Sequence, residues 1–296
     1  MTGKAQVDGA DVARLIALAA LWGASFIFMR VLAPALGPLF TATSRVFIAG
    51  VVMVAYARVA GFDGGLGRNW RRFAAIGVVG SAIPFALFSF AALRLPASYM
   101  AILNAATPFF VLLLSARFTG ERLTWPKVAG LGLGLAGVAL VSGAGPVAVD
   151  GSFLLATGAC LGATFCYAAN AVYIRLRAGD LAPRAIAGWS QVFAGFVLLP
   201  ATLIAPLPPL AAFTPAILGN MAGLALLCSA LAYLLYYRLI ADIGPTRALT
   251  VTFLIPLFGM LWGALILGET ITWPMVAGCL LVLAGTGSVL RRTSPR

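Results

Sequence analysis

The residues best suited to hold a small molecule are uncharged polar and aromatic side chains inside long apolar runs of the sequence. A hydroxyl or amide in apolar surroundings needs a hydrogen-bonding partner, and neighbouring rings offer faces on which an apolar group or a cation can pack. Residues of this kind include Trp22, Ser25, Phe26, Ser81, Phe85, Tyr99, Asn104, Thr164, Tyr167, Asn170, Ser229, Tyr233 and Thr252. Their chemistry is binding by hydrogen bonds and ring contacts, without proton transfer.

Residues for acid–base or metal chemistry are missing from the apolar runs. The chain has no histidine, and all eight acidic residues lie outside these runs. Ser-His-Asp triads, His-ligated metals and a buried carboxylate proton relay are therefore not expected. The four cysteines lie in apolar runs without a CxxC spacing, so we interpret them as packing residues. We predict that the protein is not an enzyme and uses no metal or cofactor.

The composition indicates an integral membrane protein. Of 296 residues, 62% are apolar and only 9% are charged, whereas soluble domains carry about 25% charged residues. Helices satisfy their own backbone hydrogen bonds in lipid, and about 20 apolar residues cross the bilayer. We expect an all-α polytopic membrane protein with ten transmembrane helices, near residues 12–32, 39–59, 71–92, 98–118, 125–142, 151–174, 184–205, 215–237, 246–267 and 273–290.

The basic residues indicate how the chain is oriented. If the N-terminus is cytoplasmic, 17 Lys and Arg residues fall on that side and only Arg30, Arg45 and Arg94 fall on the outer side. This distribution follows the positive-inside rule, so both termini are expected in the cytoplasm. It also explains the net charge of +12 without a nucleic-acid partner. We expect Arg45 to face protein or to reach outward, with attraction of carboxylates to an outer vestibule as the alternative.

The sequence contains an internal repeat. Residues 120–130 recur as residues 268–278, with Gly-Glu, Thr-Trp-Pro and Val-Ala-Gly in the same register. We therefore predict two five-helix units, residues 1–145 and 146–296. Because five is odd, the second unit must be inverted relative to the first, and the loss of all basic residues from the second Thr-Trp-Pro turn agrees with this.

Inverted repeats are frequent in transporters, where substrate binds near the membrane midplane beside interrupted helices. Pro108 and its counterpart Pro256 lie near the middle of the fourth and ninth predicted helices, so we propose them as gating or hinge residues. A kink needed only for packing is the alternative.

Several stretches resemble the EamA family of the drug/metabolite transporter superfamily. They are residues 21–26 (Leu-Trp-Gly-Ala-Ser-Phe), residues 45–50 (Arg-Val-Phe-Ile-Ala-Gly), and the segment from Ala97 through Pro108 to Gly137. The resemblance implies an inner-membrane carrier of bacteria that exports small metabolites, commonly amino acids, by alternating access. It also implies a central cavity lined by the first, third, fourth, sixth, eighth and ninth helices. The thirteen residues named above lie on these helices and are our candidate substrate-binding residues.

A cavity with aromatic walls and a few hydroxyls and amides suits a neutral or aromatic amino acid. Asn104 and Asn170 are the sharpest candidates, although hydrogen bonding between helices is an alternative for both. Packing against lipid or protein is the alternative for each aromatic residue. Without a carboxylate inside the helices, we expect facilitated transport or exchange. The alternative function is export of another small uncharged metabolite or drug.

Two further features admit a structural and a functional interpretation. Glu121 and Glu269 stand at helix starts, where they complement the helix dipole or act as a gating latch. Gly130 and Gly134 form a GxxxG surface for close helix packing. We expect this surface to pack internally in a monomer, with a dimer contact as the alternative; the expected partners are an amino acid and the lipid bilayer.

Overall fold

The described part of the protein is entirely helical. The computed structural model describes residues 8–61, 65–143 and 149–290, and the predicted boundary at residues 145 and 146 lies outside them. Two segments, Val78–Ala82 and Gly223–Leu231, are π-helical, and Leu210–Ala212 forms a 3-10 turn. The elements are α1 (Gly9–Leu36), α2 (Pro38–Val59), α3 (Leu66–Gly77), η1 (Val78–Ala82), α4 (Ile83–Ala91), α5 (Ala97–Asn104), α6 (Thr107–Phe118), α7 (Trp125–Gly143), α8 (Gly151–Arg177), α9 (Pro183–Ile204), η2 (Leu210–Ala212), α10 (Pro215–Ala222), η3 (Gly223–Leu231), α11 (Ala232–Ile243), α12 (Pro245–Ala248), α13 (Val251–Leu267) and α14 (Trp273–Leu290).

Among the described residues, eight helical stretches are long and apolar enough to cross a membrane. Two further apolar helices, Val251–Leu267 and Trp273–Val289, are shorter. Large apolar side chains cover the outside of the bundle, as lipid contact requires: Leu154, Phe196 and Leu265 are more than half exposed. The expected all-α polytopic membrane protein is therefore confirmed, while the count of ten transmembrane helices stays a prediction.

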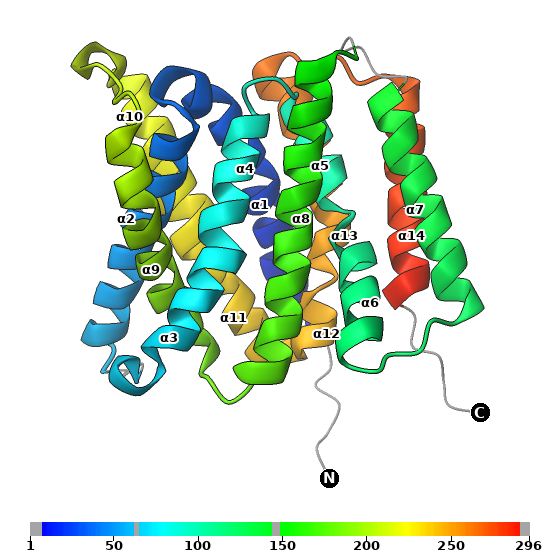
Figure 1. Cartoon of the computed structure of the whole chain (residues 1–296), viewed down its shortest axis with the longest axis horizontal. Helices are drawn as coiled ribbons and strands as arrows, with labels where there is room; N and C mark the ends of the chain where they lie inside the picture. Colours follow the sequence, from blue (N-terminus) through cyan, green and yellow to red (C-terminus); the bar gives the residue numbers. More distant parts are fainter. Residues whose placement is uncertain (1–7, 62–64, 144–148, 291–296) are drawn as a thin grey trace.

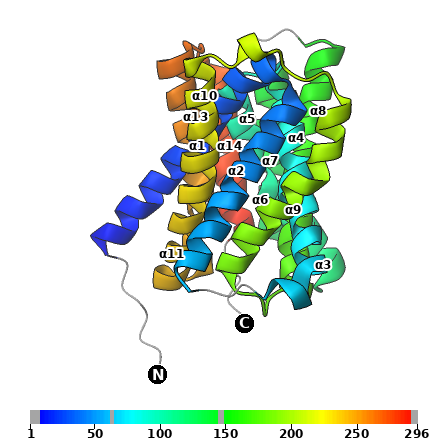
Figure 2. The ribbon, with the colours of Figure 1, turned by 90° about the vertical axis from the view of Figure 1, so that its left-hand side faces the viewer.

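Two helix pairs lie at opposite ends of the long axis of the bundle. In Figure 1, α2 and α9 pack at the left and α7 and α14 pack at the right, with the other helices between them. The described chain begins and ends on the same face, since α1 starts and α14 finishes at the lower side in both views (Figure 2).

The two Trp-Pro turns lie at opposite ends of the bundle. Trp125 starts α7 at the lower end in Figure 1, and Trp273 starts α14 at the upper end. Both indole side chains are 80% exposed, as expected for residues at the two membrane interfaces. The opposed placement of these turns is what an inverted repeat requires.

Glycine lets α7 and α14 approach closely. A Cβ atom at Gly137 would lie 2.6 Å from the carbonyl oxygen of Gly278, and one at Gly130 would lie 2.7 Å from that of Gly285. Small residues at such contacts are the usual means of packing helices in lipid, where apolar burial gives little drive for association. The predicted GxxxG surface thus packs inside the chain.

The helix that contains Pro108 is interrupted, but the one that contains Pro256 continues. α5 ends at Asn104 and α6 restarts at Thr107, immediately before Pro108. Pro256 lies inside α13, and the turn in that region precedes Val251. In the second half the chain therefore turns between α12 and α13, before Pro256, and the hinge role of both prolines stays a prediction.

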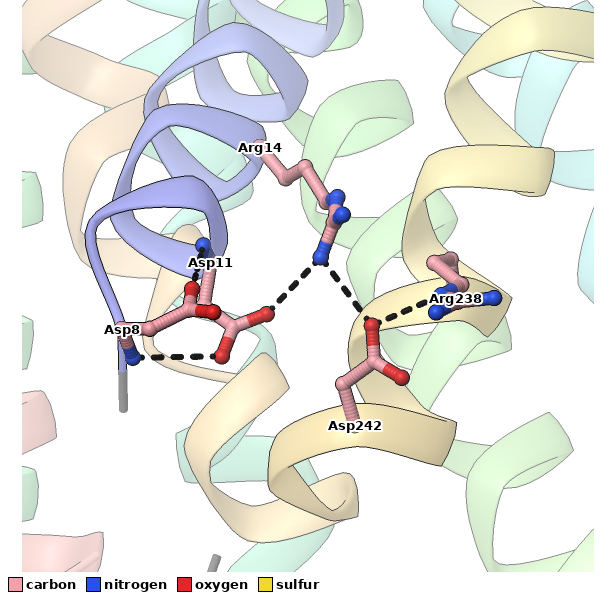
Figure 3. A network of polar contacts seen from close by, with 5 residues as sticks. All are labelled: Asp8, Asp11, Arg14, Arg238 and Asp242. Carbon is pink, nitrogen blue, oxygen red and sulfur yellow. Dashed lines mark hydrogen bonds and ion pairs between the residues drawn. The ribbon is translucent and has the colours of Figure 1, made fainter. Parts of the chain in front are cut away.

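Charged groups join α1 to α11 at the lower end of the bundle (Figure 3). Asp8 and Asp11 form a capping box at the start of α1, in which Asp8 Oδ1 accepts from the Asp11 backbone N–H at 2.8 Å. Arg14 Nη1 lies 3.0 Å from both Asp11 Oδ1 and Asp242 Oδ2. Asp242 also binds Arg238. This network fixes the beginning of α1 on the end of α11.

Glu269 binds the start of another helix, not its own. Its carboxylate accepts from the backbone N–H groups of Ala97 at 2.6 Å and Ser98 at 3.0 Å, and from Ser98 Oγ at 2.6 Å. It thereby complements the N-terminus of α5, whose N–H groups have no partner within the helix. Glu121 instead pairs with Lys127, which is buried. Of the two interpretations left open for Glu269, complementing a helix dipole therefore holds for α5, and a gating latch between the halves stays a prediction.

We expect Gly137→Ala to destabilise the protein by about 1–3 kcal/mol, because the new methyl group would overlap backbone atoms of α14. The midpoint of thermal unfolding (Tm) in detergent measures this effect. Gly132→Ala is the matched control on the same helix, since no atom lies within 4 Å of its Cβ position. Equal Tm values for the two variants would contradict the packing described for α7 and α14.

We expect Glu269→Gln to lower the Tm by a few degrees, a loss of about 1–3 kcal/mol, because charge-assisted hydrogen bonds to a helix start are weakened. Asp180→Asn is the control, since Asp180 forms an exposed ion pair with Arg72. If the control lowers the Tm as much as Glu269→Gln, the carboxylate has no special structural role at α5.

Candidate functional site

Ring contacts connect five of the predicted binding residues in two groups. Tyr167 of α8 packs on Phe85, with ring centroids 6.4 Å apart. It also stacks on Phe88, which in turn meets Phe26 of α1. In the second group, Trp22 of α1 meets Tyr233 of α11 at 6.3 Å. Aromatic side chains from four helices therefore pack on one another inside the bundle.

Arg45 of α2 lies between the two ring groups. Its guanidinium carbon is 3.8 Å from the centroid of the Phe85 ring, within range of a cation–π interaction. Its Nε donates to Ser229 Oγ at 2.9 Å. The residue is only 5% exposed, so it faces protein, as expected. Its charge also acts on Tyr167 and Tyr233, one tyrosine from each ring group.

Ser81 and Ser229 occupy the two π-helical segments. The internal repeat relates Gly120 to Gly268, an offset of 148 positions, and the same offset relates Ser81 to Ser229. The two π-helical segments therefore occupy equivalent places in the two halves. Ser81 Oγ accepts from Gln191 Nε2 of α9 at 3.0 Å, whereas Ser229 Oγ accepts from Arg45 of α2. π-Helical segments within longer helices are frequent at functional sites. Each half thus presents a hydroxyl to a polar side chain of the other half.

Two amide oxygens in this region are buried without a hydrogen-bonding partner among the described residues. They are Gln191 Oε1 and Asn170 Oδ1. The Asn170 amide lies directly on Gly80, where a Cβ atom would come within 2.3 Å of Nδ2. An unpaired buried acceptor is costly, so these oxygens are available to a donor from a ligand.

We define the Arg45 cluster as the eight residues that these contacts bring together. Tyr233 belongs to it because its hydroxyl lies within interaction range of both Ser81 and Gln191. The members are Arg45, Ser81, Phe85, Tyr167, Asn170, Gln191, Ser229 and Tyr233.

Five other predicted binding residues lie outside this cluster. Tyr99 is buried against Phe153. The hydroxyls of Ser25 and Thr164 donate to carbonyl oxygens of their own helices, and that of Thr252 donates to Leu249 in the turn before α13. Asn104 ends α5, and its carbonyl oxygen accepts from Thr107 Oγ1. These residues stay candidates whose role in binding the structure does not test.

Sequence reasoning missed Gln191 as a site residue and placed Arg45 outside the site. Gln191 satisfies the rule used for the others, an uncharged polar side chain within an apolar run. It was passed over because the resemblance did not assign its helix, α9, to the cavity, and applying the rule to every helix would have found it. Arg45 is charged and fell outside that rule; it was considered only as a residue that faces protein, reaches outward or attracts carboxylates to an outer vestibule.

The cluster can bind but has no group suited to proton transfer or metal ligation. No acidic residue belongs to it, and the described residues contain no group of three or more His, Cys, Asp or Glu residues able to hold a metal ion. Its donors are the guanidinium and hydroxyls, its acceptors are the two amide oxygens, and its walls are aromatic.

Comparison with known proteins gives relatives that include two named as an exporter or a transporter. The chain is 25% identical to a probable terminal-alkyne amino-acid exporter of Streptantibioticus cattleyicolor, over 95% of this chain and 94% of that one. It is 25% identical to protein PecM of Dickeya dadantii, over 89% and 86% of the two chains. It is 27% identical to an uncharacterized inner membrane transporter, YedA, of Escherichia coli K12, over 87% and 83%.

A solved crystal structure has the same fold, with a TM-score of 0.68 at 17% identity and coverage of 95% and 96% of the two chains. The EamA-like transporter family matches this chain twice, at residues 12–143 and at residues 154–291. Together these matches cover nearly all of the sequence. The chain is a multi-pass membrane protein that belongs to the EamA-like transporter family.

Proposed function

We propose that this protein exports neutral or aromatic amino acids across a bacterial inner membrane by alternating access. Transport is facilitative or by exchange, and the cargo range resembles that of the aromatic and neutral amino acid exporter YddG. The observation that carries the proposal is the Arg45 cluster, which combines aromatic walls, hydroxyls and unpaired amide oxygens in the interior without a carboxylate. The name of the Streptantibioticus relative, an amino-acid exporter, supports the same cargo class.

The proposed architecture is ten transmembrane helices in two inverted repeats, residues 1–145 and 146–296. Three observations support it. α7 packs on α14 and α2 packs on α9, and in each pair the two helices occupy equivalent places in the two halves. The Trp-Pro turns lie at opposite ends of the bundle. The family aligns once with each half. With both termini in the cytoplasm, the lower end in Figure 1 is the cytoplasmic side.

An asymmetry between the halves supports alternating access. At the upper end, Glu269 of the second half holds the start of α5 in the first half. Its counterpart, Glu121, pairs with Lys127 in the same half. A carrier that is open to one side of the membrane has contacts between its halves at the closed end and lacks them at the open end. Breaking the contacts at one end and forming them at the other would open the carrier to the opposite side. Pro108, beside the interruption between α5 and α6, is placed to act as a hinge for this movement.

Counterflow in proteoliposomes tests the cargo class. Vesicles loaded with a panel of neutral and aromatic amino acids are expected to accumulate labelled amino acid, and Tyr167→Leu is expected to reduce this uptake at least about tenfold by removing ring contacts. Phe165→Leu is the matched control, since Phe165 lies on the same helix but is 45% exposed. Uptake of an uncharged drug or metabolite with no amino acid handled would favour the alternative function.

The absence of a carboxylate from the Arg45 cluster leads to a prediction about whether transport is coupled to protons. We expect the amino acid gradient alone to drive flux at equal pH on both sides, because the Arg45 cluster contains no acidic group that could carry a proton. Flux is measured with and without an imposed pH gradient of one unit in each direction. Flux that occurs only with the pH gradient, whatever the amino acid gradient, would contradict facilitated transport or exchange.

A further inference from the structure

We propose that Arg45 is the carboxylate-binding residue of the transport site, so that the cargo must carry a free carboxylate or a similar anion. This inference deepens the proposed function and rests on it for the identity of the cargo. The starting observation is a buried cation without an ionic partner. Among the described residues, no carboxylate lies within 4 Å of its guanidinium, and its partners are neutral: Ser229 Oγ, Met29 Sδ and the Phe85 ring.

The depth of Arg45 in the bundle makes this arrangement costly. Arg45 is the eighth residue of α2, which places it roughly 10 Å along the helix from Pro38. An arginine does not lose its proton in proteins, so it cannot avoid the cost by becoming neutral. Natural proteins keep such a group mainly where it binds something, and intramembrane charges commonly mark substrate pathways.

The guanidinium is also prepared for an anion. Nε is held by Ser229 and Nη1 by the weak acceptor Met29 Sδ at 3.7 Å, while the structure assigns no acceptor to Nη2 among the residues it describes. Ser229 is itself fixed, because its hydroxyl donates to the carbonyl oxygen of Leu224 at 3.0 Å within the π-helical segment. The planar group is thus oriented over the Phe85 ring with donors left for a carboxylate, whose geometry it matches.

The surrounding residues complete a site for a zwitterion. Gln191 Oε1 and Asn170 Oδ1 are buried acceptors that an ammonium group could satisfy. Gln191 is brought close to α2 because its backbone lies against Gly50, where a Cβ atom would be 3.0 Å from the Gln191 carbonyl carbon. Tyr167 and Tyr233 are only partly buried, and their rings offer surfaces for an apolar side chain. A carboxylate at Arg45 and an ammonium at the amides would therefore lie within one cluster.

The test compares ligands that differ only at the carboxyl or amino group. Phenylalanine, phenylalaninamide and phenylpyruvate compete with the labelled amino acid in counterflow by the full-length wild type and by Arg45→Met. In wild type, phenylalanine should compete about 10- to 100-fold better than its amide, the range expected for a charge-assisted contact. In Arg45→Met, phenylalanine should lose this advantage and the amide should be unaffected. Arg30→Met is the control, since Arg30 Nη1 donates to the Ala92 carbonyl oxygen outside the cluster.

The outcomes separate this inference from the proposed function. Equal competition by acid and amide in wild type, or an unchanged acid-to-amide ratio in Arg45→Met, overturns the role of Arg45. If Arg45→Met does not fold, the wild-type ratio alone decides. If no amino acid is transported but phenylpyruvate binds in a manner that depends on Arg45, the proposed cargo is wrong and the anion site stands. If neither ligand depends on Arg45, the inference fails whatever the cargo is.

Discussion

The hydrocarbon core of a membrane offers no hydrogen-bonding partner, and this constraint determines both the helical backbone of the protein and the places where the backbone departs from a regular α-helix. A backbone in lipid must be helical, so departures from the regular α-helix are tolerated only where protein groups satisfy the freed atoms. The bundle makes such departures at η1, at η3 and between α5 and α6. In two of them a side-chain hydroxyl serves the backbone: Ser229 donates to Leu224, and Thr286 of α14 donates to the carbonyl oxygen of Ala105.

These departures also locate the polar interior. A π-helical segment shifts the register of side chains by one position per turn, which turns Ser81 and Ser229 toward helices of the opposite half. Glycine has a matching role outside the cluster, where Gly137 and Gly278 bring α7 and α14 into backbone contact. Glycines therefore have two different roles in this bundle. Those between α7 and α14 allow close packing at one end of the long axis, and Gly80 makes room for Asn170 in the cluster.

Hydropathy and charge predicted much of this arrangement, because both are properties of single segments. The apolar runs, the Trp-Pro turns and the aromatic residues Trp22, Phe85 and Tyr167 were read directly from the sequence. Contacts between distant segments were not predictable in this way. Glu269 has its partners at Ala97 and Ser98, and which helix start it would reach depends on the packing of α13 beside α5. Likewise, the rotation of α2 decides whether Arg45 faces lipid, solvent or the cluster, and the composition of α2 does not specify that rotation. Similarly, the sequence drew attention to Pro256, whereas the turn in the ninth predicted helix lies before Val251.

A carrier must bind its cargo without holding the empty site in one stable arrangement. As the proposed transport site, the Arg45 cluster would meet this requirement through incomplete pairing. A carboxylate next to Arg45 would have satisfied the charge permanently and left no energetic reason to admit an anion. Neutral partners instead orient the guanidinium but leave its positive charge without an ionic partner. A bound anion would therefore stabilise the conformation in which the cluster residues contact it most completely. Because Arg45 and Ser229 belong to different halves, as do Gln191 and Ser81, a ligand that engages both pairs would couple binding directly to the relative position of the halves.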